Sequence, residues 1–137
     1  MNAKLLGLGL LICFFSGLSA CQQEPYEQGR RLYELNCQNC HLEDGEGLRG
    51  LIPPLAESDF WAADPASMAC WIAYGMEGEI VVNGKTYNQP MPGVENLTPT
   101  QIANIINFVG NAWGNETPFV SYNAVEAALN DCIEISK

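Results

Sequence analysis

The chain has 137 residues, of which 47% are hydrophobic and 16% charged; this length allows one domain but is too short for two ordinary cores. Its 16 acidic and 6 basic side chains give a formal charge of −10, which argues against nucleic acid as a partner, because phosphate binding requires clustered Lys and Arg. Six cysteines accompany a single histidine, and this count excludes any metal site that needs two histidines from one chain.

The first 20 residues are predicted to be a secretory signal peptide. Lys4 is followed by an apolar run over residues 5–15 and then by small residues, the layout of such a segment. The uncharged stretch has 16 residues, short of the roughly 20 that span a bilayer. Residues 18–21 resemble a bacterial lipobox, which implies acylation of Cys21 and a lipidated tether over residues 21–25. We therefore expect an anchor on the exported side of a membrane in the bacterial cell envelope, facing the periplasm in a Gram-negative cell.

Residues 26–37 are predicted to form a helix in which Gly29, Tyr33 and Cys37 lie on one face. A glycine inside a helix costs about 1 kcal/mol relative to alanine. We therefore expect Gly29 to mark the close approach of another helix. Residues 43–54, rich in Gly and Pro, are predicted to form a loop.

The middle of the chain is predicted to contain one helix and one β-hairpin. The helix opens at Asp64 and Pro65, as an N-cap followed by proline in the first helical position, and closes at Gly75. Residues 80–82 and 85–87 are strand-forming runs joined by an Asn-Gly pair, which is a strong hairpin signal.

The clearest helix signal covers residues 98–113. Thr98 is the expected N-cap, and Gln101 completes a capping box. The apolar stripe of this helix consists of Ile102, Ile105, Ile106 and Val109. A last short helix over residues 122–130 makes residues 116–137 a C-terminal helical appendage instead of a second domain. These elements predict an all-α domain with one short β-hairpin.

Cys37, Cys40 and His41 form a C-x-x-C-H sequence after a helix in an exported chain, the attachment signature of c-type haem. The two thiols can add to the two haem vinyl groups, and the adjacent imidazole then reaches the iron from one face. Three alternatives compete with haem. A thioredoxin-like redox pair would need a βαβ setting, a zinc site would have to recruit Cys70 and Cys132, and a disulfide within the motif would leave His41 without a role. The motif favours haem over all three.

The second axial ligand cannot be a histidine of the same chain, because His41 is the only one. Methionine is the usual partner in electron-transfer haem proteins, where it raises the reduction potential. Met68 falls within a predicted helix and is expected to fill the core. Met76 follows that helix directly and could reach a haem, but nothing in the sequence around it would hold it there. Met91 lies between two prolines that restrict the backbone, so we expect Met91 to bind the iron.

With these motifs, residues 25–115 resemble the class I cytochromes c. They are especially similar to the single-haem domains fused to copper nitrite reductases and quinoprotein dehydrogenases. The matching positions are Gly29, Tyr33 and Cys37 in the N-terminal helix of that family, and Ile105 and Phe108 in its C-terminal helix. The resemblance implies the small all-α class I fold over residues 26–115, in which the glycine permits the two helices to cross.

The resemblance also implies roles for individual residues in haem binding. Residues 52–55 are similar to the proline loop of the family, in which the carbonyl of Pro53 would accept the second ring N–H of the ligating histidine. Residues 84–92, which include Tyr87, are similar to the methionine-ligand segment and support Met91 independently. The implied cofactor is one haem c, covalent through Cys37 and Cys40, with His41 and Met91 on the iron.

Cys70 and Cys132 remain once the signal-peptide cysteine, the lipidated cysteine and the two motif cysteines are assigned. In an oxidising compartment two such cysteines most simply pair with each other. The disulfide would enclose about sixty residues and stabilise the fold by about 4 kcal/mol in the chain-entropy model.

The predicted function is that of a lipid-anchored electron carrier that passes single electrons between respiratory redox partners. We expect no enzymatic activity and no small-molecule substrate, because no other catalytic constellation is present in the sequence. Two alternatives stay open: a haem enzyme or gas sensor with an open sixth iron position, and a fixed electron-entry subunit of a membrane complex. The sequence contains no copper or quinoprotein domain, so the partner would be a separate protein. Removal of Lys4 with the signal leaves a net charge of −11, which predicts a basic docking surface on that partner.

Overall fold

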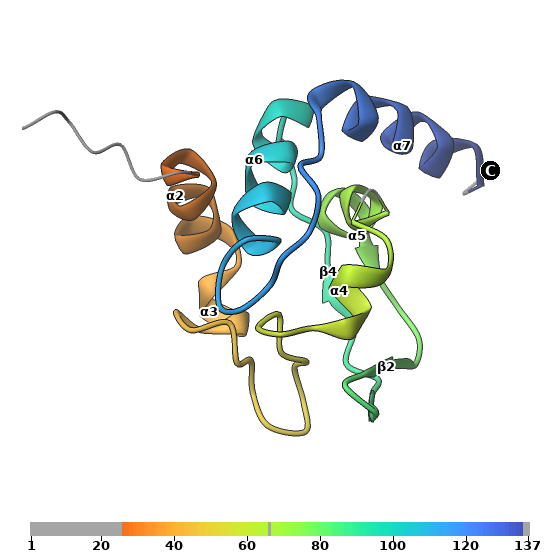
Figure 1. The fold of residues 1–137 in the computed structure, drawn as a ribbon. Helices are drawn as coiled ribbons and strands as arrows, with labels where there is room; N and C mark the ends of the chain where they lie inside the picture. Colours follow the sequence, from red (N-terminus) through yellow and green to blue (C-terminus); the bar gives the residue numbers. More distant parts are fainter. Residues whose placement is uncertain (1–25, 66, 136–137) are drawn as a thin grey trace, which may run out of the picture.

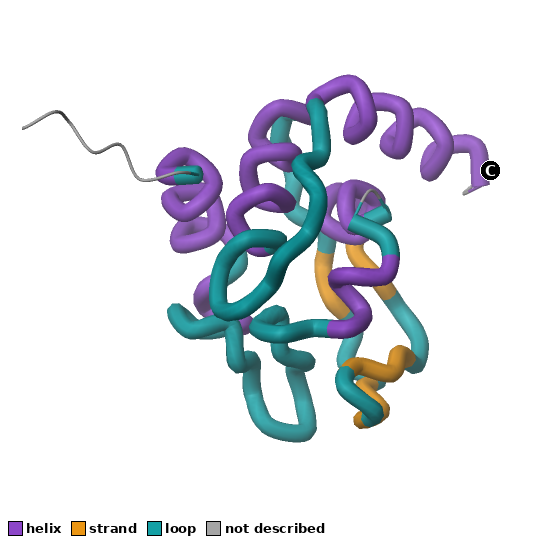
Figure 2. Tube along the Cα trace, in the orientation of Figure 1, coloured by secondary structure: helices purple, strands orange, loops and turns teal. Residues whose placement is uncertain are grey.

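The computed structural model describes residues 26–65 and 67–135, and the fold in these ranges is mostly helical (Figure 1). The predicted signal peptide, Cys21 and the tether lie outside the described residues. The elements are α2 (Glu27–Asn36), α3 (Gln38–His41), α4 (Asp59–Ala63), α5 (Met68–Tyr74), β1 (Gly75–Met76), β2 (Ile80–Val82), β3 (Lys85–Tyr87), β4 (Met91–Pro92), α6 (Pro99–Val109) and α7 (Tyr122–Ile135). Figure 2 shows most loops gathered at the end of the molecule opposite α7. None of these helices is long and apolar enough to cross a membrane.

The local chemistry at both ends of α6 explains where this helix begins and ends. The Gln101 N–H donates to the Thr98 hydroxyl at 3.3 Å, and the Thr98 N–H donates to the Gln101 side chain at 2.8 Å, so the predicted capping box is confirmed. The helix ends at Val109, earlier than the predicted end at residue 113. The chain turns back there, with Thr117 packed over Gly110 and its N–H donating to the Gly110 carbonyl at 2.9 Å.

The helix predicted from Asp64 to Gly75 begins four residues later than expected, as α5, and a helix that was not predicted, α4, ends directly before Asp64. Ser58 caps α4, with its hydroxyl accepting a backbone N–H of the first turn at 3.2 Å. Asp64 ends α4 instead of opening a helix, and its carboxylate accepts the Ser67 N–H at 3.2 Å. Helix α5 therefore begins only at Met68, and it ends at Gly75 as predicted.

Two short antiparallel ladders complete the fold. The predicted hairpin is confirmed as β2 and β3, and the residues of its turn, Asn83 and Gly84, both have positive φ, 50° and 73°, as a type I′ turn requires. The second ladder pairs β1 with β4, so that Met76 lies opposite Met91. This pairing was not predicted, because strands of two residues carry no alternating pattern.

Helix α7 lies across α5 and α6 and is longer than predicted (Figure 1). Val125 of this helix is fully buried, and Ala128 and Leu129 pack against the core. Cys70 in α5 and Cys132 in α7 form a disulfide with their Cα atoms 5.9 Å apart. Apolar packing and a covalent bond therefore both join α7 to the rest of the domain.

The crossing of α2 and α6 brings their backbones into contact at Gly29. A Cβ at this position would overlap the carbonyl oxygen of Asn104 and come within 2.6 Å of the Cβ of Phe108. The expectation that Gly29 marks a close helix approach is confirmed. The apolar stripe predicted for α6 is also buried at its interface with the core, where Ile102, Ile105, Ile106 and Val109 are at most 1% exposed.

Three aromatic rings pack together beside this crossing. Tyr33, which is 1% exposed, has its ring centroid 5.6 Å from that of Phe108 and 5.0 Å from that of Trp113. Phe108 and Trp113 contact each other edge to face at 5.3 Å, a favourable geometry for aromatic pairs. The Tyr33 hydroxyl donates to the Leu42 carbonyl at 2.6 Å, which ties α2 to the residue directly after α3.

The substitution Gly29→Ala is predicted to destabilise the protein even though alanine favours helices. The overlap with α6 should cost about 1–3 kcal/mol and outweigh the gain in helix propensity of about 1 kcal/mol. Guanidinium denaturation measures the difference in free energy of unfolding. Leu35→Ala, at a position of the same helix that is 76% exposed, is the control and should stay within about 0.5 kcal/mol of the parent. A Gly29→Ala variant as stable as the parent would contradict the tight crossing.

Candidate functional site

Two adjoining cavities lie among α3, the loop at residues 52–55, the end of α5 and the β1–β4 ladder. Their volumes are about 70 and 110 Å³, and both are partly open to solvent. Both are lined by Cys37, His41, Pro53, Ile72, Met76, Ile80 and Met91. Because they share these residues, the two cavities form one crevice.

The C-x-x-C-H residues lie at the edge of the crevice, in and directly before α3. The carbonyl of Cys37 accepts the N–H of Cys40 at 3.1 Å and that of His41 at 2.9 Å, so one short helical turn fixes the spacing of the motif. Neither cysteine is in a disulfide; Cys37 is half-buried and Cys40 exposed. Burial, and secondly the proximity of Cys40, raise the pKa of the Cys37 thiol to about 12, so this thiol is neutral at physiological pH.

His41 is buried in the wall of the crevice, where it is 8% exposed. Its Nδ1 lies 3.3 Å from the carbonyl oxygen of Pro53, the partner that the family resemblance implied. Burial lowers the pKa of His41, although the Pro53 carbonyl acts in the opposite direction. When Nδ1–H donates to Pro53, the lone pair of the neutral ring is on Nε2, which is then free to bind a metal.

Gly47 and Asn115, two residues whose roles are not evident from the sequence, hold the loop that carries Pro53. Gly47 has a φ of +64°, and a Cβ there would lie 2.6 Å from the Pro53 carbonyl oxygen. The buried side chain of Asn115 donates to the carbonyls of Leu55 at 2.7 Å and Val109 at 2.8 Å, which ties the loop to α6. The glycines of this loop are visible in the sequence, but no local pattern indicates which carbonyl each approaches or what Asn115 binds.

The three methionines considered as ligands differ in position. Met68 is 3% exposed and packs in the core, as expected for a residue that fills space, and it lines only one of the two cavities. Met76 and Met91 both line the crevice and lie opposite each other in the β1–β4 ladder. Side chains opposite each other in such a ladder project to the same face. The interpretation that nothing holds Met76 near a haem is therefore wrong.

Trp61 and Tyr87 fit a cofactor that is apolar in its body and acidic at its edge. Trp61 is 6% exposed, and among the described residues its Nε1 is buried without a hydrogen-bond partner. Such a donor is costly unless a bound group accepts from it, and a haem propionate is an acceptor of this kind. Tyr87 is 7% exposed and lines the crevice, with the Nζ of Lys85 5.4 Å from the centre of its ring. The residues present therefore fit haem.

The alternatives to haem find less support in the same residues. Within residues 26–65 and 67–135 no three His, Cys, Asp or Glu side chains are grouped to hold a metal ion. Cys70 and Cys132, which a zinc site would have to recruit, are bonded to each other. Cys37 and Cys40 are not paired, and they follow helix α2 instead of the strand that a thioredoxin-like motif would need.

Comparison with known proteins agrees with this site. The family model described as Cytochrome c matches residues 26–113. The chain is 36% identical over 93 residues to the cytochrome c subunit of alcohol dehydrogenase (quinone) from Gluconobacter oxydans, which covers 66% of this chain and 19% of that subunit. It is 31% identical over 103 residues to a cytochrome c-552 from Thermus thermophilus; the matched residues make up 72% of this chain and 66% of that protein. The chain thus spans about a fifth of the first relative and about two thirds of the second. It belongs to the cytochrome c family, a family of electron-transfer proteins, and carries covalently bound haem c.

Proposed function

We propose that this protein is a lipid-anchored carrier of single electrons, with one haem c bound through Cys37 and Cys40 and with His41 and Met91 as axial ligands. The observation that carries the proposal is that one crevice is lined by the motif residues, the only histidine and the methionine of a proline-flanked segment. When bound, haem supplies a cycle between ferrous and ferric iron, which transfers one electron without a substrate.

The residues of the crevice orient the ligands and control the surroundings of the iron. The Pro53 carbonyl fixes the ring of His41 and raises its basicity. The buried Trp61 Nε1–H is available to a propionate. Apolar side chains such as Ile72 and Ile80 exclude water, and a site of low polarity favours the ferrous state, which carries less charge.

Met91 is the better candidate of the two methionines in the β1–β4 ladder. Pro90 and Pro92 limit the backbone conformations of its segment, so a thioether there loses less freedom on binding. The resemblance of residues 84–92 to the methionine-ligand segment of related domains supports the same choice. Met76 is then a neighbour that packs against the cofactor.

The substitution Met91→Ala is predicted to abolish the weak red absorption band that a ferric methionine-ligated haem gives. It should also lower the reduction potential and allow carbon monoxide to bind rapidly to the reduced protein, because the sixth position opens. Met76→Leu, a swap of similar volume, is the matched control and should keep the band. Loss of the band in Met76→Leu alone would reverse the assignment of the ligand. Absence of the band in the parent, with rapid carbon monoxide binding, would favour the gas-sensor or enzyme alternative.

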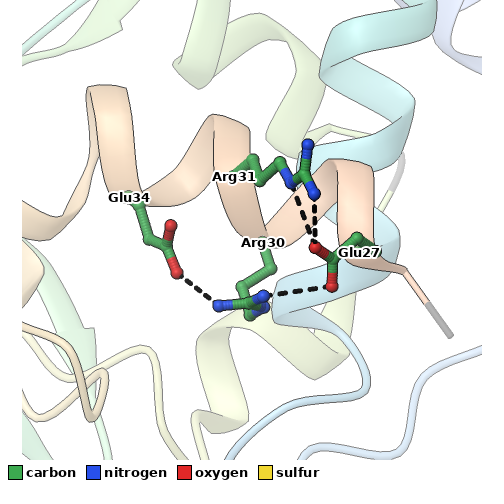
Figure 3. Close-up of polar contacts among 4 residues, drawn as sticks. All are labelled: Glu27, Arg30, Arg31 and Glu34. Atoms are coloured by element: carbon green, nitrogen blue, oxygen red, sulfur yellow. Dashed lines mark hydrogen bonds and ion pairs between the residues drawn. The ribbon is translucent and has the colours of Figure 1, made fainter. Parts of the chain in front are cut away.

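The charge of the chain supports a partner with a basic docking surface. In α2, Arg30 pairs with Glu27 at 3.0 Å and with Glu34 at 2.7 Å, and Arg31 pairs with Glu27 at 2.9 Å (Figure 3). These exposed pairs contribute little stability, but they neutralise both arginines of the helix. Helix α2 therefore presents no basic patch, and the formal charge of the full chain is −10.

We predict that the rate of electron transfer to the physiological partner falls by about tenfold or more as ionic strength rises from about 0.01 to 0.15 M, because salt screens the attraction that steers the encounter. Stopped-flow kinetics over a salt series measures this rate. The same series with a small neutral oxidant is the control and should show little change. A partner reaction that is insensitive to salt would contradict the basic docking surface.

A fixed subunit of a membrane complex is the second candidate function, and one observation favours it: the Gluconobacter relative is named as a subunit of a dehydrogenase. In both cases Cys21 is proposed to carry the lipid. We predict that the full chain partitions with membranes, that Cys21→Ser releases it, and that fatty-acid labelling is lost in this variant. Purification of the parent in mild detergent then separates the two functions: a free cytochrome indicates a mobile carrier, and a stable assembly with another redox protein indicates a subunit. Membrane association of Cys21→Ser would contradict the lipid anchor.

A further inference from the structure

A disulfide joins the helix that precedes the methionine ladder to the C-terminal helix. Cys70 lies in α5, six residues before Met76, and Cys132 lies in α7, 62 residues after Cys70. We propose that this disulfide, acting through α5, positions Met91 for binding to the iron. The inference rests on the proposed function, because it takes Met91 as the axial ligand.

The end of α5 and the strand of Met91 contact each other through backbone atoms. Strand β1 continues directly from α5 and pairs with β4. A Cβ on Gly75 would lie 2.5 Å from the carbonyl oxygen of Met91, and a Cβ on Gly93 would lie 2.6 Å from the carbonyl oxygen of Ala73. Because no side chain separates the two segments at these glycines, a shift of α5 displaces the backbone that carries Met91.

A hydrogen bond fixes the same segment to α5 at a second point. The N–H of Val94, three residues after Met91, donates to the carbonyl of Ile72 at 2.8 Å. Ile72 is 5% exposed and itself lines the crevice. The ladder and this bond together hold residues 91–94 against the last turn of α5, so the position of Met91 depends on the position of that helix.

Helix α5 is short and is not capped by the side chain of its N-cap residue. It has seven residues, too few for a stable isolated helix, and Ser67 at its N-cap makes no side-chain capping bond. Met68 and Ala69 pack into the core, whereas the half-buried Cys70 bonds to α7. Helix α7 has 14 residues and is held by the buried Val125. The disulfide therefore links the short helix to a longer element that is anchored independently.

The double substitution of Cys70→Ala with Cys132→Ala tests this inference in the full haem-loaded protein, well below its unfolding temperature. We expect the red ferric band to weaken, and carbon monoxide to bind the reduced protein about tenfold faster, because that rate follows the fraction of molecules in which Met91 has left the iron. Ile106→Ala, which truncates a fully buried residue outside the crevice lining, is the control for lost stability and should leave both signals unchanged.

If the double variant does not fold, the native protein supplies a second test. Dithiothreitol transfers two electrons and two protons to the disulfide, leaves two thiols and becomes a cyclic disulfide itself; the thiols are then alkylated and the haem is reoxidised. The same loss of the red band is expected. The inference would be overturned if, after either treatment, the band and the carbon monoxide rate equal those of the parent. The disulfide would then contribute only to the overall stability of the protein. A parent without the band, or a Met91→Ala variant that retains it, would instead overturn the ligand assignment.

Discussion

The backbone contact between α2 and α6 at Gly29 is the constraint on which the rest of the domain depends. Because the helices meet without an intervening side chain, the separation of their axes is fixed by atoms that cannot rotate away. Cys37 follows α2 directly, so the contact also sets where the haem motif lies relative to α6. The residues of α6 that line the crevice, Ile105 and Val109, belong to the same buried stripe. The packing of α6 against α2 therefore also determines the shape of the crevice.

Among the described residues, the buried polar side-chain atoms near the crevice have hydrogen-bond partners within the chain, with one exception. Asn115 uses its buried amide for backbone groups of the proline loop and α6, and His41 Nδ1 lies next to the Pro53 carbonyl. Trp61 Nε1 is the exception among the described residues. In a site of low dielectric, polar groups with partners make the structure rigid, whereas a buried donor without a partner is costly and favours binding of a group that accepts its hydrogen bond. The indole N–H of Trp61 is therefore the group in the crevice that most needs a partner from outside the chain.

Besides the helix crossing at Gly29 and the Cys70–Cys132 disulfide, the sequence predicted mainly those parts of the fold whose energy is local. The capping box at Thr98 and the turn at Asn83 involve residues no more than four positions apart, and the C-x-x-C-H spacing carries its chemistry within five residues. Asp64 was misjudged because its carboxylate can accept a backbone N–H at the end of one helix as well as at the start of another. The places of Met76 and Asn115 depend on partners far along the chain, and no local pattern encodes those.

The disulfide and the haem motif occupy separate stretches of the chain. The covalent loop closed by Cys70 and Cys132 contains Met76 and Met91, whereas the C-x-x-C-H motif lies entirely before it. In the proposed holoprotein, thioether bonds restrain the histidine side of the iron and the loop restrains the methionine side. The two bond-forming reactions share no atom and consume no common thiol. The connectivity therefore does not by itself require one order of cofactor attachment and disulfide oxidation during maturation.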